Sequence, residues 1–293
     1  MPPASDEAGL LEDRLERGEI VTFDPCPFAL PARDDRNFLL AQRPGGRIHK
    51  DISFSPVRNA TTGFIRESDA QASRLHAILG EFTHRAAAWL GQVLPRYAAR
   101  WQPDRVTFRS EEEAIRKLRL TARNDLLHVD AFPSRPTRGA RILRLFVNLH
   151  ATDPHVWATS LPFEDLFEKY SRFVGPSDWL ADGWARRLGQ GLLNLFQPGA
   201  TARTPYDHFM LRLHHFLKTS DHFQERSPRK LWHFPPGSAW LLFTDGVAHA
   251  ELRGQFALDH SFFIPQDALA IPHKSPFTLF EQAWRRPPLK QAV

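Results

Sequence analysis

The sequence predicts an α+β protein whose core is a double-stranded β-helix of the jelly-roll, cupin-like kind, with flanking helices and a helical insertion between its two halves. Short alternating strands begin near Val106 and return after a Pro-Gly turn just before Ser238. Between them, roughly residues 161–230 have the apolar spacing of helices. The last part runs strand, tight turn, histidine-bearing strand, glycine, strand, which is typical of the second half of a small jelly roll.

Length and composition limit the possible domain organisation and location of the protein. The 293 residues can bury one large core, so we expect a single domain over 1–293, with an N-terminal α/β segment at 1–105 and the jelly-roll core at about 106–160 and 231–270. Hydrophobic residues make up 42% and charged residues 24%, which argues against extensive disorder. Cys26 is the lone cysteine, and neither a transmembrane run nor a signal peptide is present, so we expect a cytoplasmic protein.

The elements follow in order from local patterns. Within 1–20 lies a short amphipathic helix, and the clearest helix begins at Ser68, which forms a capping box with Gln71 and precedes an apolar stripe from Leu75 to Tyr97. Such a stripe packs a helix against a sheet. Further helices are expected at 35–42, 163–173, 179–196 and 206–217, and strands at 20–23, 114–121, 125–131, 141–149, 238–244, 247–252 and 256–264.

The stretch from Leu127 to Pro133 places His128 and Asp130 two residues apart in an apolar strand. Alternate residues of a strand face the same side, so both side chains point into one space. A buried carboxylate needs a partner, which a metal ion with His249 as third ligand would provide. Two histidines and a carboxylate form the facial triad of non-haem iron oxygenases, and the HExxH helix of zinc hydrolases is absent. A core histidine beside a capped aspartate is the alternative that the short motif leaves open.

Three stretches are similar to one known family. They are Leu127 to Pro136 with its continuation Arg141-Ile142-Leu143-Arg144, then Tyr206-Asp207 with Met210 and His214, and then His249-Ala250 with Gly254-Gln255-Phe256. Together they resemble the Kdo hydroxylases of Gram-negative bacteria, where Kdo is 3-deoxy-D-manno-oct-2-ulosonic acid. The resemblance runs from about Gly18 to Pro265.

This resemblance implies an Fe(II)- and 2-oxoglutarate-dependent dioxygenase that consumes O₂, with ascorbate helpful in vitro. Its metal ligands would be His128, Asp130 and His249. Its substrate would be Kdo-lipid A, the glycolipid in which Kdo joins lipid A to the lipopolysaccharide core, and its product would be Ko, the sugar hydroxylated at C3. The sequence departs from the family at 259–262, where Asp-His-Ser-Phe stands in place of Glu-Gln-Thr-Phe.

The far carboxylate of 2-oxoglutarate needs a cation. Arg144 is expected to face inward on its strand, where a guanidinium can form a bidentate pair, and Asn148 would be a neutral donor on the same face. Arg253 is the second candidate, and Ser261 is a further expected cosubstrate contact. The alternative for Arg144 is a salt bridge to a carboxylate on a helix.

Arg135 and Arg138 lie in the loop beyond the ligands, where an anionic sugar and lipid phosphates would approach, and solvated loop charges are the alternative. The glycolipid would bring the protein to the cytoplasmic face of the inner membrane. Although the formal net charge is +5, the chain has no zinc-finger spacing or Walker loop, so no nucleic-acid partner is expected. Two other functions stay open: the same iron chemistry on another sugar or a protein, and a non-catalytic jelly roll that holds a metal.

Overall fold

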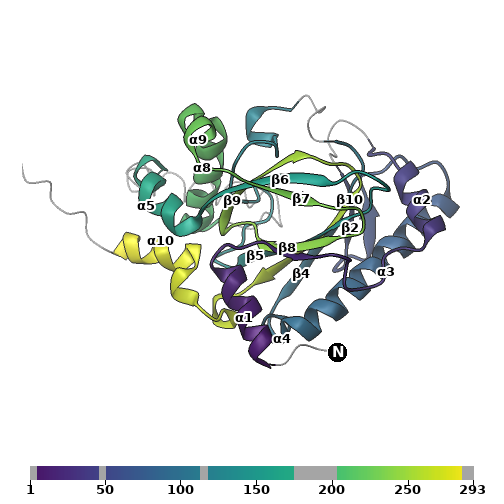
Figure 1. Ribbon diagram of the computed structural model, residues 1–293, viewed down its shortest axis with the longest axis horizontal. Coiled ribbons are helices and arrows are strands. Elements are labelled where there is room, and N and C mark those ends of the chain that lie inside the picture. The colour runs from purple at the N-terminus through teal and green to yellow at the C-terminus, as the bar shows by residue number, and fades with distance from the viewer. Residues whose placement is uncertain (1–4, 46–50, 113–117, 175–202, 286–293) are drawn as a thin grey trace, which may run out of the picture.

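Two antiparallel sheets form the centre of the molecule in a computed structural model that describes residues 5–45, 51–112, 118–174 and 203–285. The larger sheet has the strand order β1-β8-β5-β10-β4-β2-β3, and the smaller has the order β7-β6-β9. Figure 1 shows the two sheets facing each other, with helices around them. The strands are β1 Val21–Phe23, β2 Ile52–Ser55, β3 Ala60–Thr62, β4 Gln102–Arg109, β5 Arg141–Asn148, β6 His155–Pro162, β7 Lys230–Phe234, β8 Ala239–Phe243, β9 Val247–Arg253 and β10 Ala257–Ile264.

The helices fall into two groups along the chain. The first group is α1 Ser5–Glu16, α2 Arg33–Ala41, α3 Asp69–Val93 and α4 Pro95–Ala98. The second is α5 Phe163–Val174, α8 Pro205–Thr219, α9 Asp221–Arg226 and α10 Pro276–Arg285. In Figure 1 the second group lies together at one end of the sheets, whereas α3 runs along the other side. Helix α3 begins as predicted, because the Ser68 side chain accepts a hydrogen bond from the Gln71 backbone N–H.

Strand alternation divides the buried side chains among three cores. Leu143, Leu145 and Val147 of β5 pack toward α3 in the first core, while Phe146 faces the space between the sheets in the second. The third core joins α5, α8, α9 and α10 to Ala248 and Ala250 on the outer face of β9. Strand β5 is buried along its whole length because it has a core on each face.

Most of the predicted elements are confirmed, but two strands are wrong. In the described part of 114–121, Leu120 begins a 3₁₀ turn that ends at Ala122. In the predicted strand 125–131, the chain bends at 125–126 and then makes one isolated bridge, between His128 and His249, in place of a regular strand. Packing against helices α8 and α9, described below, holds this segment without a full ladder of hydrogen bonds.

The predicted helix 179–196 lies outside the described residues. The single-domain division stays a prediction; β1 and β2, from the expected N-terminal segment, pair directly with the core strands β8 and β4. In the described part of the chain no helix is both long and apolar enough to cross a bilayer.

Candidate metal centre

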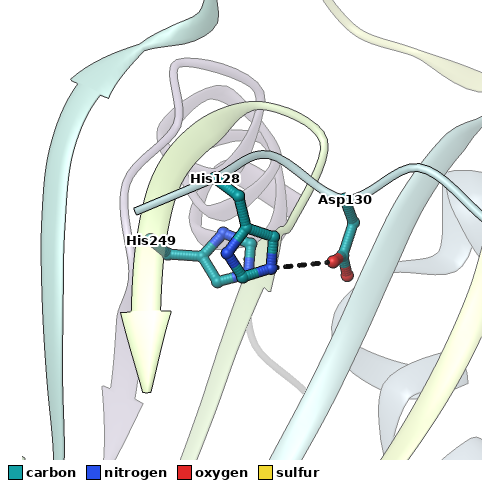
Figure 2. A group of neighbouring side chains, drawn as sticks. All are labelled: His128, Asp130 and His249. Carbon is teal, nitrogen blue, oxygen red and sulfur yellow. Dashed lines mark ion pairs between the residues drawn. The ribbon is translucent and has the colours of Figure 1, made fainter. Parts of the chain in front are cut away.

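His128, Asp130 and His249 come together between the sheets. Each offers one ligand atom, and these atoms lie within 4.8 Å of one another. All three are buried, with 3%, 7% and 3% of their surface exposed. Figure 2 shows His128 and Asp130 on one extended segment and His249 on β9, with the carboxylate facing the two imidazole rings. The predicted triad is therefore assembled in space, as strand alternation required.

Backbone hydrogen bonds fix the position of the ligand segment. His128 N–H donates to the His249 carbonyl at 3.0 Å, and His249 N–H donates back at 2.8 Å. Asp130 N–H donates to the carbonyl of Thr244, just beyond β8, at 2.8 Å. From the other side, the Gln224 amide of α9 accepts from Leu127 N–H at 3.0 Å and donates to the Leu127 carbonyl at 2.9 Å. Gln224 thus takes the place of a neighbouring strand.

The side-chain hydrogen bonds of the histidines suit a metal site. His128 Nδ1 donates to the Leu126 carbonyl at 2.7 Å, and His249 Nδ1 donates to the Val247 carbonyl at 3.1 Å. With the proton on Nδ1, each neutral ring keeps a lone pair on Nε2. His128 Nε2 then faces Asp130 Oδ1 at 3.5 Å. A cation fits this donor set, and carbonyl acceptors of this kind commonly orient metal-binding histidines.

Burial and the neighbouring polar groups together keep the triad in the required protonation states. Desolvation lowers the pKa of His128 well below 6.5, and the Lys218 ammonium lowers it further. Desolvation also lowers the pKa of His249, against the pull of Asp130. Burial alone would raise the pKa of Asp130, but His128 and the Arg144 guanidinium outweigh it and hold this pKa well below its ordinary value. Neutral imidazoles and an ionised carboxylate result.

Helix α8 supports the triad from behind. The His214 ring packs edge-on against His128, with 5.0 Å between ring centroids, and His214 Nδ1 donates to the Val129 carbonyl at 2.7 Å. Lys218, one turn further along the helix, is also buried, and its ammonium donates to the Thr121 carbonyl at 3.4 Å. The 3₁₀ turn that replaces the predicted strand is therefore attached to the same helix as the ligand segment.

A chain of buried charges of alternating sign extends from the triad. Arg144 Nη1 donates to Asp130 Oδ2 at 2.9 Å, and its Nη2 donates to Asp259 Oδ1 at 2.7 Å. Arg109 Nε then donates to Asp259 Oδ2 at 3.0 Å, and Arg109 Nη1 pairs with Glu251. Burial would raise the pKa of Glu251, but Arg109 and His155 lower it to about 2. Each of these buried charges has a partner of opposite sign.

A cavity of about 20 Å³ lies between the triad and this chain of charges. Its wall includes four residues that the sequence did not single out, namely Arg109, Asn124, Trp157 and Glu251. The Trp157 ring stacks on His249, with 5.6 Å between centroids, and its buried Nε1 has no hydrogen-bond partner in the described structure. Glu251 had a local signal, because it lies two residues after His249 and shares its face of β9.

The expected cosubstrate residues lie in different places. Arg144 faces the triad as predicted, although its partners are strand and ligand carboxylates and not a helix carboxylate. Ser261 is buried opposite Arg144 in the β5–β10 pair. The Asn148 amide donates to the carbonyls of Asp153 and Phe234, both at 3.0 Å, so its donors are used within the fold. Arg253 is exposed at the end of β9. Asn148, Arg253 and Ser261 do not line the cavity at the triad.

The predicted substrate arginines differ in exposure. Arg135 pairs with Asp104 and lies over the Phe132 ring at 4.0 Å, and burial lowers its pKa to about 10. Arg138 is exposed, and its backbone N–H donates to Asp207 Oδ1 of α8 at 3.0 Å. The same carboxylate accepts the N–H of the preceding residue, at 2.8 Å, so α8 holds the loop in place.

A jelly-roll core that gathers two histidines and a carboxylate between its sheets is the arrangement of the non-haem iron oxygenases, and this is the class that the fold and the site define. Comparison with known proteins gives the particular family. The sequence profile of the 3-deoxy-D-manno-oct-2-ulosonic acid (Kdo) hydroxylases matches residues 3–287. The chain belongs to this Kdo hydroxylase family and is an enzyme.

Solved structures agree with this assignment. The chain is similar to the apo structure of the Kdo hydroxylase KdoO, a non-haem Fe(II) α-ketoglutarate-dependent dioxygenase, with 30% identity, a TM-score of 0.86 and coverage of 98% of this chain and 93% of that one. The KdoO complex with α-ketoglutarate and Fe(III) has 29% identity and a TM-score of 0.85, covering 100% and 95%. The cobalt(II) complex has 30% identity and a TM-score of 0.86, with the same coverage. None of the curated proteins compared matches the chain.

Proposed function

We propose that this chain uses Fe(II), 2-oxoglutarate and O₂ to hydroxylate Kdo at C3, giving Ko in Kdo-lipid A. The observation that carries the proposal is the buried triad, whose ligand atoms lie within 4.8 Å of one another beside a cavity lined by two guanidinium groups. A cation among neutral imidazoles and one carboxylate, next to positive charge for an acidic cosubstrate, is what this reaction requires. The KdoO structure solved in complex with α-ketoglutarate and Fe(III) supports the same chemistry.

In this proposal His128, Asp130 and His249 hold the iron, which when bound supplies the O₂ activation that hydroxylation of a C–H bond needs. The protein positions these ligands and shields them from water. The Nδ1 hydrogen bonds of both histidines aim their Nε2 atoms at the metal, and Arg144 orients the Asp130 carboxylate. Trp157 covers His249 and keeps water away from it. No side chain is required as a general base.

The two guanidinium groups then have separate roles. Arg144 contacts Asp130 directly, so it lies next to the metal position and acts on the ligand. Arg109 lies one carboxylate further along the chain of charges and also lines the cavity. The far carboxylate of 2-oxoglutarate is separated from the chelating end by two methylene groups, so it needs a cation that does not contact the metal ligands directly. We therefore assign the far carboxylate to Arg109, where the sequence favoured Arg144. A cavity of about 20 Å³ is too small for the cosubstrate, so Arg109 must move away from its carboxylate partners to receive it.

The substrate would approach from the loop after the ligands. Kdo carries a carboxylate and lipid A carries phosphates, so an exposed guanidinium at the entrance would attract both. Arg138 is exposed and has the backbone N–H of its loop anchored by Asp207, whereas Arg135 is already paired with Asp104. We assign first contact with the anionic glycolipid to Arg138 and a supporting position to Arg135. A glycolipid substrate would also bring the protein to the cytoplasmic face of the inner membrane.

The test is succinate release by the purified protein with Fe(II), ascorbate, 2-oxoglutarate and Kdo-lipid A, with mass spectrometry of the glycolipid. Succinate formation that depends on the substrate, with a gain of one oxygen on the Kdo unit, is expected from the wild type and not from His128→Ala. Succinate without a modified glycolipid would retain the oxygenase and exclude this substrate, and a panel of free sugars would follow. Iron-loaded protein that releases no succinate with any acceptor would contradict the proposal and favour a binding protein.

A further inference from the structure

A second cavity lies away from the triad, where α1 ends, β9 and α5 begin, and the 3₁₀ turn Pro272–Lys274 passes. Its volume is about 170 Å³, compared with about 20 Å³ for the cavity at the triad. Because one water needs only about 10–15 Å³ by this kind of measure, the space admits a small organic molecule. Charged residues dominate the wall, which includes Glu16, Arg17, Arg141, Glu164 and Lys274.

Arg141 is the deepest of these charges. Only 1% of its surface is exposed, and its side chain leaves β5 on the face opposite to Arg144. Its Nε donates to Asp245 Oδ2 at 2.9 Å, and its guanidinium lies over the Phe243 ring at 4.2 Å. Among the described residues, its two terminal nitrogens Nη1 and Nη2 have no hydrogen-bond partner. A buried guanidinium that makes one of its five possible hydrogen bonds is costly unless a ligand takes the others.

The neighbouring charges already have partners. The Glu16 carboxylate accepts from the Tyr97 hydroxyl at 2.6 Å and from two backbone N–H groups at 2.7 and 2.6 Å. Arg17 donates twice to Asp13, at 2.7 and 2.9 Å. Lys274 pairs with Glu164 at 3.3 Å and is about one-third exposed, so its ammonium keeps donors for a further contact. The unused donors of this cavity thus belong to Arg141 at its base, to Lys274 at its entrance and to Nη1 of Arg17, whose charge is already balanced by the two hydrogen bonds to Asp13.

The wall also leaves space for the guanidinium at one particular residue. A Cβ on Gly246, in the turn between β8 and β9, would lie 2.2 Å from Arg141 Nη2. The backbone of Gly246 does not have a positive φ, so the absence of a side chain here serves the approach of Arg141 and not the turn itself. This position offers a way to block the cavity without removing the buried ion pair.

We propose that this cavity is a binding site for a small oxyanion, a carboxylate or phosphate group held by Nη1 and Nη2 of Arg141 with Lys274 at the entrance. A planar guanidinium with two free N–H₂ groups binds such anions in a bidentate way. The site is one ion pair away from the metal centre, because Asp245 also lines a small cavity beside Asp130. The inference rests on Arg141 and does not depend on the reaction proposed above.

The test is calorimetric titration of the full-length protein with inorganic phosphate and, separately, with malonate, at ionic strength held constant with chloride. Saturable binding of at least one of the two anions is expected, and whichever binds more tightly identifies the class. Gly246→Ala, which displaces Nη2, should weaken binding about tenfold or more, because it removes a hydrogen bond between charged groups. Lys274→Met should weaken binding by a smaller factor.

Arg17→Met is the matched control, because it removes a cation from the same wall whose hydrogen bonds go to Asp13. It should leave the affinity unchanged. Two outcomes would overturn the proposal: no saturable heat with either anion, or the same affinity in the wild type and in both Gly246→Ala and Lys274→Met, which would place the anion elsewhere. The circular dichroism spectrum and melting temperature of each variant verify that the fold is retained. Gly246→Ala is used in place of a substitution of Arg141 because it keeps both residues of the buried Arg141–Asp245 pair.

Discussion

The space between the two sheets has an aromatic end and a charged end, and the same strands build both. At the aromatic end, Trp240 stacks on Phe234 with 4.0 Å between ring centroids and on Phe146 with 5.4 Å. At the charged end, two residues before Phe146 on β5, Arg144 joins Asp130 to Asp259. Trp157 lies at the boundary, in contact with Trp240 on one side and His249 on the other.

The aromatic end contributes mainly to stability, and the charged end contributes mainly to the proposed chemistry. The aromatic end buries large apolar surface with no charge, which favours folding. The charged end buries ions whose mutual attraction only offsets their desolvation, so it contributes little net stability. What it provides is geometry around the proposed metal ligands. Substitutions at the aromatic end should therefore affect unfolding, whereas substitutions at the charged end that leave its ion pairs intact should affect metal binding and turnover.

The largest effect is expected at the charged end for His249→Ala. Loss of a residue that hydrogen-bonds to a metal ligand typically lowers metal affinity or activity about 10–100-fold. Loss of a direct ligand should have a larger effect. Turnover should fall to background while the free energy of unfolding of the metal-free protein changes little. Cobalt(II) titration followed by visible absorption, together with urea unfolding, would measure both.

His233→Ala is the matched control for this substitution, because His233 lies on β7 of the same small sheet and its side chain is exposed. It should leave both cobalt binding and turnover intact. If His249→Ala bound cobalt as tightly as this control, the metal would not be held by His249, and the assignment of the charged end would fail.

The next effect is expected at the aromatic end. Trp240→Ala should lower the free energy of unfolding by about 4 kcal/mol, because it leaves a cavity in a closely packed cluster. Trp240→Phe should cost much less, since it keeps a stacked ring and removes an indole N–H that has no partner in the described structure. Urea unfolding measures both. Equal losses in the two variants would show that stacking at this end does not determine stability.

The sequence predicted the three residues of the proposed metal site because their signals are local. His128 and Asp130 show the alternation of a strand, and His249 lies in a well-marked strand near the end of the chain. Arg109 and Asp259 gave no such signal, since they are far apart in the sequence and meet only through the pairing of β4 with β10. Buried ion pairs of this kind depend on which strands become neighbours, and local patterns do not specify that.

The wrong strand at 125–131 has a related cause. Its apolar alternation is real, but only His128 pairs with β9, and Gln224 supplies hydrogen bonds that a neighbouring strand would otherwise make. Alternation predicts which face each side chain occupies, and that prediction is correct here. It does not predict whether the backbone partner is a strand or a glutamine side chain on a helix.

A smaller effect should separate the two arginines of the charged end. Arg109→Lys keeps the charge but loses the planar fork, so it should raise the KM for 2-oxoglutarate roughly tenfold or more while the affinity for cobalt stays the same. Arg144→Lys should weaken cobalt binding instead, because Arg144 orients the Asp130 ligand. Steady-state kinetics and cobalt titration on both variants make the comparison. If the KM for 2-oxoglutarate rose in Arg144→Lys alone, Arg144 and not Arg109 would bind the far carboxylate of 2-oxoglutarate.

The smallest effect concerns the outer face of β10, behind the charged end. His260 is fully buried, and neither ring nitrogen has a hydrogen-bond partner among the described residues. Burial lowers its pKa from 6.5 to about 3. Below pH 6.5, His260 therefore binds a proton in the unfolded chain but not in the native protein. The free energy of unfolding falls for this reason as the pH decreases from 6.5 toward 3. At about pH 5.5 this one residue should cost roughly 1.4 kcal/mol.

Other buried histidines, including His128 and His214, shift in the same direction, so the contribution of His260 must be isolated by substitution. His260→Leu should unfold with less pH dependence than the wild type between pH 7.5 and 5.5, because the variant has no proton to exclude at this position. At pH 7.5 its stability should be equal or higher, since two unsatisfied nitrogens are removed. His84→Gln, at an exposed position of α3, should keep the pH dependence of the wild type. An unchanged pH slope in His260→Leu would mean that the native protein protonates His260 readily, and that the apolar packing behind the charged end is looser than the structure indicates.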